Sequence, residues 1–345
     1  MTGILPLHRR SLIAGTAAVL AMPAIARGAG ALETAQVEIA GVRDPQLGAQ
    51  LAVAETYGYF KDEGLEVNLH WNQSAADTLT TMASGVPVGV GGIFTQVVFG
   101  GQKLPIKTIS ALADIAETQG FVISPGVKLA SPKELEGKKL AFTQGNSQVL
   151  LLAKLAKVYG FDTSKITMVN MQQSEGIVAA SKGDVQGLLG WQPNLYRLEQ
   201  LGGKMYANGT TSYATGAEQK LAYDDWLQFN HSVLLASQEW IDGKPNTLAA
   251  LLRAMKRATE LLASDRPKAL VAMKEKLKID ADALVVMANA NKYGLGLTDR
   301  LARSLSFQSG WAMEIKRIKA PVTPAEVFAP SILAAVDLSL VSFKA

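Results

Sequence analysis

The feature that most constrains the fold of this chain is an alternation of strand-like and helix-like segments that occurs twice. In the first occurrence, apolar residues recur at every second position in the strand-like segments and at every third or fourth position in the helix-like segments. We expect strands over 36–42, 65–71, 86–90 and 106–112, and helices over 45–60, over 74–83 and from near Phe94. This order favours a mostly parallel sheet with helices on both faces.

The alternation starts again after Ser131-Pro132-Lys133-Glu134, which combines a cap, a proline at the first helical position and a glutamate at the third. We expect further strands over 139–142, 166–171 and 185–190, and helices over 148–159, 174–181 and 193–201. Both occurrences contain a helix that ends in Tyr-Gly, at Tyr57-Gly58 and Tyr159-Gly160. An internal repeat of this kind predicts two α/β lobes.

The C-terminal part begins with a strand over 233–236 and continues as helices without a sheet of their own. Those helices are expected over 247–263, 266–277, 281–290, 297–318 and 323–335. We expect them to cover the first lobe, so that the chain crosses between the lobes near 113–119 and near 230–233. The predicted domains are 32–114 and 231–345 for the first lobe, and 115–230 for the second.

Residues 1–31 have the composition of an export signal. His8-Arg9-Arg10 supplies the positive segment, a short apolar stretch follows, and Ala24-Ile25-Ala26 or Ala29-Gly30-Ala31 offers a cleavage site. The Arg9-Arg10 pair resembles a twin-arginine signal, so the expected location is the periplasm, reached through the Tat or the Sec route. The alternative is a frayed cytoplasmic N-terminus.

Composition excludes several classes of function. The 345 residues include no cysteine and three histidines, which removes thiolate metal sites, cysteine nucleophiles and a paired-histidine metal site. The 34 basic and 30 acidic residues give a net charge of +4, too weak to predict a nucleic-acid partner. Phosphate-loop, dinucleotide and nucleophile-elbow motifs are absent from the sequence. We therefore expect a protein that is not an enzyme and that uses no cofactor and no metal.

Three stretches resemble one family. The segment Tyr57-Gly58-Tyr59-Phe60-Lys61-Asp62-Glu63-Gly64-Leu65-Glu66-Val67 is similar to a motif of the ABC-transporter substrate-binding proteins for sulfonates, nitrate, taurine and thiamine-precursor pyrimidines. Residues 131–141 and 169–194, the latter with Gly190-Trp191-Gln192-Pro193, resemble two further motifs of that family. The resemblance implies a type II periplasmic-binding-protein fold: two parallel-rich sheets flanked by helices, two crossing strands, and a ligand in the cleft between the lobes.

The strand ends are where such a ligand is expected. In open α/β sheets ligands lie beyond the C-terminal ends of strands, where helix N-termini present free N–H groups and partial positive charge. The candidate ligand-binding residues are Arg43, Gln73, Ser74, Ala75, Ile93, Phe94 and Thr95 in the first lobe, Thr143, Gly145, Asn146, Ser147, Trp191 and Gln192 in the second, and His231 at the second crossing. A guanidinium such as that of Arg43 suits a carboxylate or a sulfonate.

Each candidate also has a purely structural interpretation. Ser74 and Ser147 are also good helix caps, and Trp191 could belong to the core. Asp44 could neutralise Arg43, and a buried histidine such as His231 is often structural. The resemblance also has two departures: Ser74-Ala75-Ala76 replaces a Ser-Gly-Ala loop, and Ile93-Phe94 replaces small hydroxyl residues. Both changes predict a more apolar cleft, and thus a ligand with an aromatic or apolar body and an acidic head.

The leading interpretation is therefore a monomeric periplasmic protein that delivers a small organic anion, a sulfonate or carboxylate, to the membrane permease of an ABC importer. Nitrate or a thiamine-precursor pyrimidine on the same fold is the alternative ligand. An enzyme on this fold is a different class, but a pyrimidine-synthesising relative would use a cysteine, which the sequence lacks. A sensor or adhesin would differ only in its partner.

Overall fold

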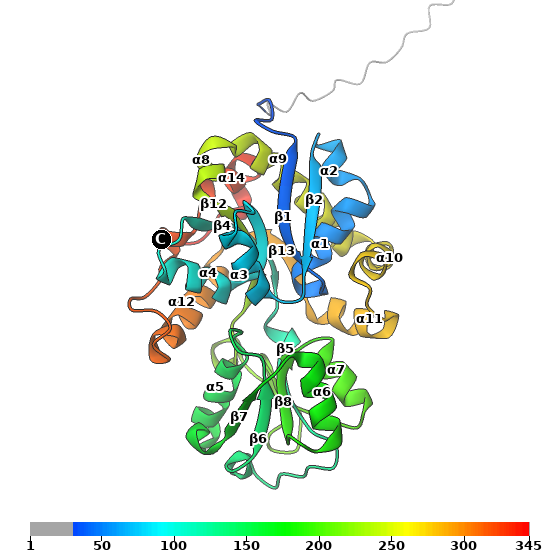
Figure 1. The fold of residues 1–345 in the computed structure, drawn as a ribbon, viewed down its shortest axis with the longest axis vertical. Coiled ribbons are helices and arrows are strands. Elements are labelled where there is room, and N and C mark those ends of the chain that lie inside the picture. The colour runs from blue at the N-terminus through cyan, green and yellow to red at the C-terminus, as the bar shows by residue number, and fades with distance from the viewer. Residues whose placement is uncertain (1–29, 345) are drawn as a thin grey trace, which may run out of the picture. The chain divides into compact units, whose positions relative to one another are not determined.

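The computed structural model describes residues 30–344 (Figure 1). The export signal expected over residues 1–31 lies almost entirely outside the described residues. In the part of the chain that is described, no helix combines the length and apolarity needed to span a membrane.

The first lobe is built on a six-stranded mixed sheet. Its strands are β1 (Gln36–Val42), β2 (Glu66–Asn72), β3 (Val88–Gly92), β4 (Ile106–Asp114), β12 (His231–Ser237) and β13 (Lys292–Gly296), in the order β13-β4-β12-β3-β1-β2. β1 pairs in parallel with β2 and β3, whereas β12 runs antiparallel to β3 and β4. The parallel strands all end at one edge of the sheet, which is where the following helices begin.

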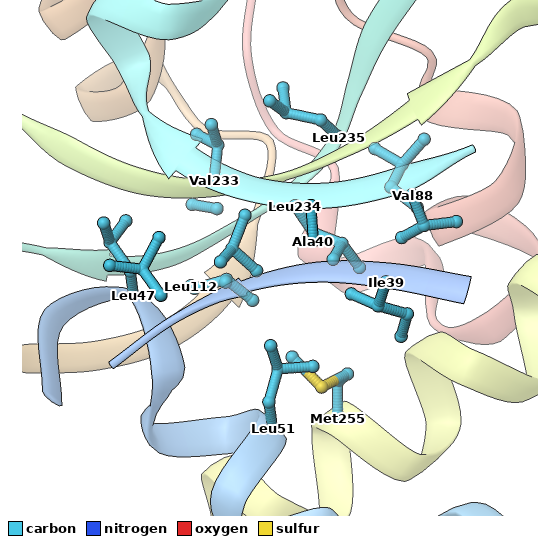
Figure 2. Packing of buried hydrophobic residues seen from close by; sticks show 14 of the residues in the cluster. Ile39, Ala40, Leu47, Leu51, Val88, Leu112, Val233, Leu234, Leu235 and Met255 are labelled. Atoms are coloured by element: carbon cyan, nitrogen blue, oxygen red, sulfur yellow. The ribbon is translucent and has the colours of Figure 1, made fainter. Parts of the chain in front are cut away.

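Helices cover both faces of this sheet. The N-terminal ones are α1 (Pro45–Thr56), α2 (Tyr59–Asp62), α3 (Ala75–Ala83) and α4 (Ile93–Gly101). The C-terminal ones are α8 (Gln238–Gly243), α9 (Pro245–Ser264), α10 (Arg266–Leu277), α11 (Ala281–Ala290), α12 (Asp299–Glu314), α13 (Pro324–Val327) and α14 (Pro330–Val336). Figure 2 shows Met255 of α9 beside Leu51 of α1 and Ile39 of β1, within one buried cluster. The C-terminal helices therefore pack on the first sheet.

The second lobe, green in Figure 1, is built on a seven-stranded mixed sheet. Its strands are β5 (Gln119–Ile123), β6 (Lys139–Phe142), β7 (Thr167–Asn170), β8 (Gly187–Trp191), β9 (Lys204–Asn208), β10 (Thr211–Ser212) and β11 (Gln219–Lys220), in the order β11-β10-β9-β5-β8-β6-β7. Its helices are α5 (Val149–Tyr159), α6 (Gln173–Lys182) and α7 (Asn194–Gln200). β6, β7 and β8 are parallel, and β5 is antiparallel to β8.

The chain passes between the sheets twice. It leaves β4 at Asp114, makes a 3-10 turn at Ala116–Thr118 and enters β5, and it returns through the segment that precedes β12. The two crossing segments contact each other, because the amide of Ile115 donates to the carbonyl of Asn230 at 3.0 Å. A second contact between the lobes is the ion pair of Arg303 on α12 with Asp224, at 2.6 Å.

Several local expectations need correction. Ser131 starts only a 3-10 turn, Pro132–Leu135, and Gly137 follows in the left-handed region at φ 80°. The helix expected over 45–60 is broken at Gly58, which has φ 72°. The helix expected over 323–335 is divided because Pro330 starts α14. The sheets are mixed rather than mostly parallel because the predicted strand β12 runs antiparallel to its neighbours β3 and β4. Short strands absent from the prediction add further antiparallel pairs; they are β5, β9, β10, β11 and β13.

Candidate functional site

A cavity of about 40 Å³ lies where the strand ends of the two sheets face each other. The first lobe and the crossing segments contribute Asp44, Gln46, Leu47, Ser74, Ala75, Gly92, Phe94, Thr95, Ile115 and Asn230. The second lobe contributes Gln119, Gly145, Asn146, Ser147, Gln148 and Trp191. We call this cavity the cleft.

Most residues of the cleft lining lie at or near the N-terminal ends of helices. Ser74 caps α3 through a capping box with Asp77, whose carboxylate accepts from the Ser74 amide at 2.9 Å. Asp44 caps α1, accepting from the Leu47 amide at 2.9 Å, and Pro45 occupies the first helical position. α4 begins after Gly92 without a side-chain cap. The N-terminal ends of α3 and α4 therefore lie at the cleft, with the partial positive charge of their free amides.

Eight of the residues expected from the sequence line the cleft together. They are Ser74, Ala75, Phe94, Thr95, Gly145, Asn146, Ser147 and Trp191. The two lobes contribute to this set in equal number. Ligands were expected beyond the C-terminal ends of the strands, which we call the strand-end rule. These eight of the residues that the rule selected meet in one cavity although they lie up to about a hundred positions apart in the chain.

The other six expected residues do not line the cleft. Arg43 lies over the ring of Trp71, 5.8 Å from its centroid, and Gln73 is exposed. Ile93 is fully buried in the core of the first lobe. Thr143 donates to the carbonyl of Met171 at 2.9 Å and lines an adjoining hollow instead.

The last two of the six have structural partners. Gln192 is buried, and its side-chain oxygen accepts from the Tyr196 amide at 3.0 Å, at the start of α7. His231 is also buried, and its Nδ1 lies 2.8 Å from the hydroxyl of Ser304. Burial lowers the pKa of His231 to about 4, so the imidazole is neutral at pH 7. These surroundings match a structural role for the histidine.

Eight residues that line the cleft were not among the candidate ligand-binding residues: Asp44, Gln46, Leu47, Gly92, Ile115, Gln119, Gln148 and Asn230. The sequence contains a signal for one of them. Asp44-Pro45, directly after the first strand, is a capping residue followed by a proline at the first helical position, which marks a helix start at a strand end. Gln119 and Asn230 had no comparable signal, because they lie in the crossing segments and β5 was not predicted.

Buried amide side chains connect the two lobes at the base of the cleft. The side-chain oxygen of Gln46 accepts from the hydroxyl of Thr118 and from Nε2 of Gln119, each at 2.5 Å. Nε2 of Gln46 donates to the carbonyl of Gln192 at 3.1 Å. The side-chain oxygen of Gln119 in turn accepts from Nε2 of Gln148 at 2.7 Å. A connected network of this kind fixes the positions of its members.

A second group of amides leaves hydrogen-bonding capacity free at the cleft. The hydroxyl of Ser147 accepts from Gln228 at 2.8 Å and from Nδ2 of Asn230 at 3.3 Å. Oδ1 of Asn230 and Nδ2 of Asn146 are buried and have no hydrogen-bond partner among the described residues. Buried polar atoms without partners are rare in proteins, so these two atoms indicate where a ligand could bind.

The cleft lining contains one titratable side chain, Asp44, and no lysine, arginine or histidine. Asp44 is 6% exposed, and its burial raises the pKa of the carboxyl from 3.8 to about 7. Positive potential at the cleft thus comes from helix N-termini rather than from side chains. The described residues contain no cluster of three or more side chains suited to hold a metal ion.

An aromatic wall borders the cleft on the α12 side. The ring of Phe94 packs against that of Trp311, with 5.2 Å between centroids. An adjoining hollow shares Phe94, Gly145 and Asn146 with the cleft and also contains Trp311, Ile315 and Arg317. The arrangement can bind a small molecule with a flat or apolar body, and it contains no pair of groups suited to acid–base catalysis.

Comparison with characterised proteins places these features in a family. A family model described as NMT1/THI5 like matches residues 48–269. The taurine-binding periplasmic protein of Escherichia coli (strain K12) is 26% identical over 145 residues, 42% of this chain and 45% of that protein. The 4-amino-5-hydroxymethyl-2-methylpyrimidine phosphate synthase of Uromyces fabae is 22% identical over 220 residues, 62% of each. The chain thus matches less than two thirds of the length of these relatives.

Solved structures with the same fold include binding proteins and an enzyme. The periplasmic aliphatic sulphonate binding protein SsuA from Escherichia coli has a TM-score of 0.71 at 13% identity, over 86% of this chain and 93% of that one. The desulfurization enzyme DSZB has a TM-score of 0.65 at 12% identity, over 89% and 100%. At these sequence identities the similarity shows the fold alone. It confirms the predicted two-lobed fold. Since the family model covers more than half of the sequence, the chain belongs to the NMT1/THI5-like family.

Proposed function

We propose that this protein is the solute-binding component of an ABC importer and that the cleft holds a small organic anion. The single observation that carries the proposal is the composition of the cleft wall, to which both lobes contribute. A solute bound there contacts both lobes at once, which is how a two-lobed binding protein couples ligand binding to domain closure. In functional terms, residues 32–114 and 231–345 act as one lobe and residues 115–230 as the other.

The expected ligand has an acidic head and an apolar body. The head is stabilised by the N-termini of α3 and α4, near Ser74 and Thr95, where amides without intrahelical partners offer hydrogen bonds to a sulfonate or carboxylate. The body lies against the aromatic rings of Phe94 and Trp191. Arg43, which we expected to pair with the anion, is not part of the lining.

The alternative ligand is a pyrimidine of the kind named in the synthase relatives. A flat heterocycle can pack against the aromatic rings of the lining, Phe94 and Trp191, as a benzene ring can. Nitrate is the other alternative ligand, and the binding screen includes it.

The family also contains enzymes, so the non-catalytic role is part of the proposal. Its support is the chemistry of the cleft, where Asp44 is the one titratable group in the lining and is hydrogen-bonded as a helix cap. Nucleophilic catalysis by cysteine is excluded because the sequence has none. A binding protein requires no more than the donors and acceptors described above.

The periplasmic location and the permease partner are inferred from the relatives, which include a periplasmic binding protein. Export through the Tat or the Sec route would bring the protein to that compartment. We expect a monomer, since a solute-binding protein presents one face of each lobe to its permease.

A binding screen tests the proposal. Thermal-shift measurements with aliphatic and aromatic sulfonates, the matching carboxylates, pyrimidines and nitrate identify the ligand class, and titration calorimetry gives the stoichiometry. We expect one organic anion per chain, recovered unaltered by mass spectrometry. Stabilisation by nitrate alone, or chemical conversion of the ligand, would contradict the proposal.

A further inference from the structure

One face of helix α12 reaches beyond the first lobe. The helix is anchored in that lobe, since Leu301 is buried in its core. Arg300, Arg303 and Phe307 follow one another at spacings of three and four positions, so they lie together on one face of the helix. All three contact the segment 223–229, which precedes β12. The lobe to which this segment belongs therefore decides what the contact connects.

The segment 223–229 belongs to the second lobe. Leu227 is buried in the core of that lobe, and its amide donates to the carbonyl of Gly209 at 2.8 Å. Nζ of Lys154, on α5, donates to the carbonyl of Trp226. The contact of α12 with this segment is therefore a contact between the lobes.

Two arginines of α12 bind this segment through charge and through aromatic faces. Arg303 forms an ion pair with Asp224 at 2.6 Å. Its guanidinium carbon lies 4.8 Å from the ring centroid of Tyr223 and 4.7 Å from that of Phe229. The guanidinium carbon of Arg300 lies 4.6 Å from the centroid of Tyr223. An exposed ion pair alone contributes little to stability, but a guanidinium over aromatic rings adds a further attraction.

Phe229 is the centre of this contact. The residue is 3% exposed, and its ring lies 5.2 Å from the rings of Tyr223 and Phe307, in edge-to-face arrangements. Nζ of Lys154, on α5, lies 5.4 Å from the centroid of the same ring. The carbonyl of Phe229 accepts from Nε2 of Gln308, on α12, at 2.9 Å. Phe229 is therefore held by helices of both lobes at once.

The contact adjoins the base of the cleft. Gln228 and Asn230, the neighbours of Phe229 in the chain, both donate to the hydroxyl of Ser147, which lines the cleft. A displacement of Phe229 would therefore change the hydrogen bonds of a residue in the cleft wall.

We propose that this cluster is a clamp that holds the two lobes in the arrangement that forms the cleft, before any solute binds. Its members are Arg300, Arg303 and Phe307 on α12, and Tyr223, Asp224 and Phe229 on the segment of the second lobe. Two lobes joined by crossing segments can separate through a hinge motion, and the clamp is a further connection that opposes it. Arg300 and Arg303 act as positioning residues, because neither contributes to the cleft lining. The inference goes beyond the proposed function, since it concerns the protein without a solute.

Distances between spin labels test the clamp. The sequence has no cysteine, so Ser84→Cys at the end of α3 in the first lobe and Ser181→Cys on α6 in the second take one label each. Both positions are exposed. We expect double electron–electron resonance on the labelled protein without solute to give one narrow distance distribution. Combining Arg300→Gln with Arg303→Gln should enlarge a second population, in which the lobes are displaced, about tenfold or more.

The matched control is Arg257→Gln. The side chains of Arg257 and Arg303 are each 41% exposed. Arg257 pairs with Asp62 at 2.9 Å and lies 4.2 Å from the ring centroid of Tyr59. These three residues all belong to the first lobe, so Arg257→Gln removes the same kinds of interaction and should leave the distance distribution unchanged. Arg303→Lys keeps a cation at its position and should also preserve the narrow distribution.

The outcomes separate the clamp from a general loss of stability. A distance distribution in the double arginine variant that matches the labelled parent overturns the inference. An equal change in Arg257→Gln, or a broad distribution in the parent, also overturns it. Circular dichroism and urea unfolding check that each variant folds. If the double variant does not fold, Arg303→Gln alone decides by the same criterion. A negative result leaves the proposed function intact, because no solute is present in the measurement.

Discussion

The side-chain oxygen of Gln46, on α1 of the first lobe, accepts a hydrogen bond of 2.5 Å from Nε2 of Gln119, the first residue of β5 in the second lobe. Both side chains are buried and both line the cleft. The geometry of the cleft thus depends on a polar contact between the lobes as well as on the two crossing segments. A ligand that contacts Gln46 or Gln119 would act directly on this connection.

Replacing Gln46 should destabilise the protein. Gln46→Ala leaves Thr118 and Gln119 without their common acceptor and the carbonyl of Gln192 without a donor. We expect a loss of about 2–4 kcal/mol in the free energy of unfolding, measured by urea denaturation. The control is Gln73→Ala at an exposed position, which should change stability by less than about 0.5 kcal/mol. Equal effects of the two substitutions would show that the network is not formed in solution.

Gly48 should not tolerate a side chain. A Cβ atom at this position of α1 would lie 2.3 Å from the carbonyl oxygen of Val42, the last residue of β1. Gly48→Ala should therefore destabilise the protein by about 1–3 kcal/mol, which lowers the melting temperature in calorimetry. Gly243→Ala is the matched control, because nothing lies within 4 Å of its Cβ position. A wild-type melting temperature for Gly48→Ala would rule out the close packing of α1 on β1.

The titration of Asp44 should reduce stability as the pH rises. Burial raises its pKa in the folded protein from 3.8 to about 7, while the unfolded chain titrates near the ordinary value. Protonated Asp44 therefore favours the folded state below pH 4, and this contribution is lost as the pH rises from about 4 to 7. The difference in unfolding free energy between wild type and Asp44→Asn should follow that curve, and Tyr293 is a titratable group that the charge of Asp44 influences. A difference that does not change with pH would contradict the burial of the carboxyl.

The titration of His231 should reduce stability as the pH falls, the opposite of the effect expected for Asp44. Burial lowers its pKa to about 4 against an ordinary value of 6.5, with Asp114 and Arg300 as the neighbouring charges. The neutral imidazole favours the folded state above pH 6.5, and that stability is lost as the pH falls from about 6.5 to 4. Urea unfolding of His231→Gln should show a smaller loss of stability on acidification than wild type shows. The same acid sensitivity in both proteins would place the histidine in contact with solvent.

The core of the fold could be predicted from the sequence because its signals are local. Strands such as Lys139–Phe142 and helices such as Arg266–Leu277 and Ala281–Ala290 agree with the prediction residue for residue, since their apolar spacing and caps lie within the segment itself. The strands β10 and β11 comprise two residues each, too few for a periodic pattern. The crossing strand β5 is buried throughout and follows a short turn, so neither alternation nor a turn signal marked it.

The site was predicted in part for a similar reason. The strand-end rule identifies loops, and three residues of those loops, Ser74, Thr95 and Asn146, line one cavity. It does not say which way a side chain points, and so it included Arg43, which stacks on Trp71 instead. Contacts between distant segments, such as that of Gln46 with Gln119, have no counterpart in local sequence patterns.

The central claim is that a small solute binds in the cleft between the lobes, and blocking the cleft tests it most directly. Ala75, at the start of α3, lines the cleft, whereas Ala83, at the end of the same helix, is exposed and does not. Titration calorimetry with the tightest ligand of the screen should give one site per chain for wild type and for Ala83→Trp. Ala75→Trp should show no measurable binding and an unchanged circular dichroism spectrum. Wild-type affinity in Ala75→Trp would contradict binding in the cleft.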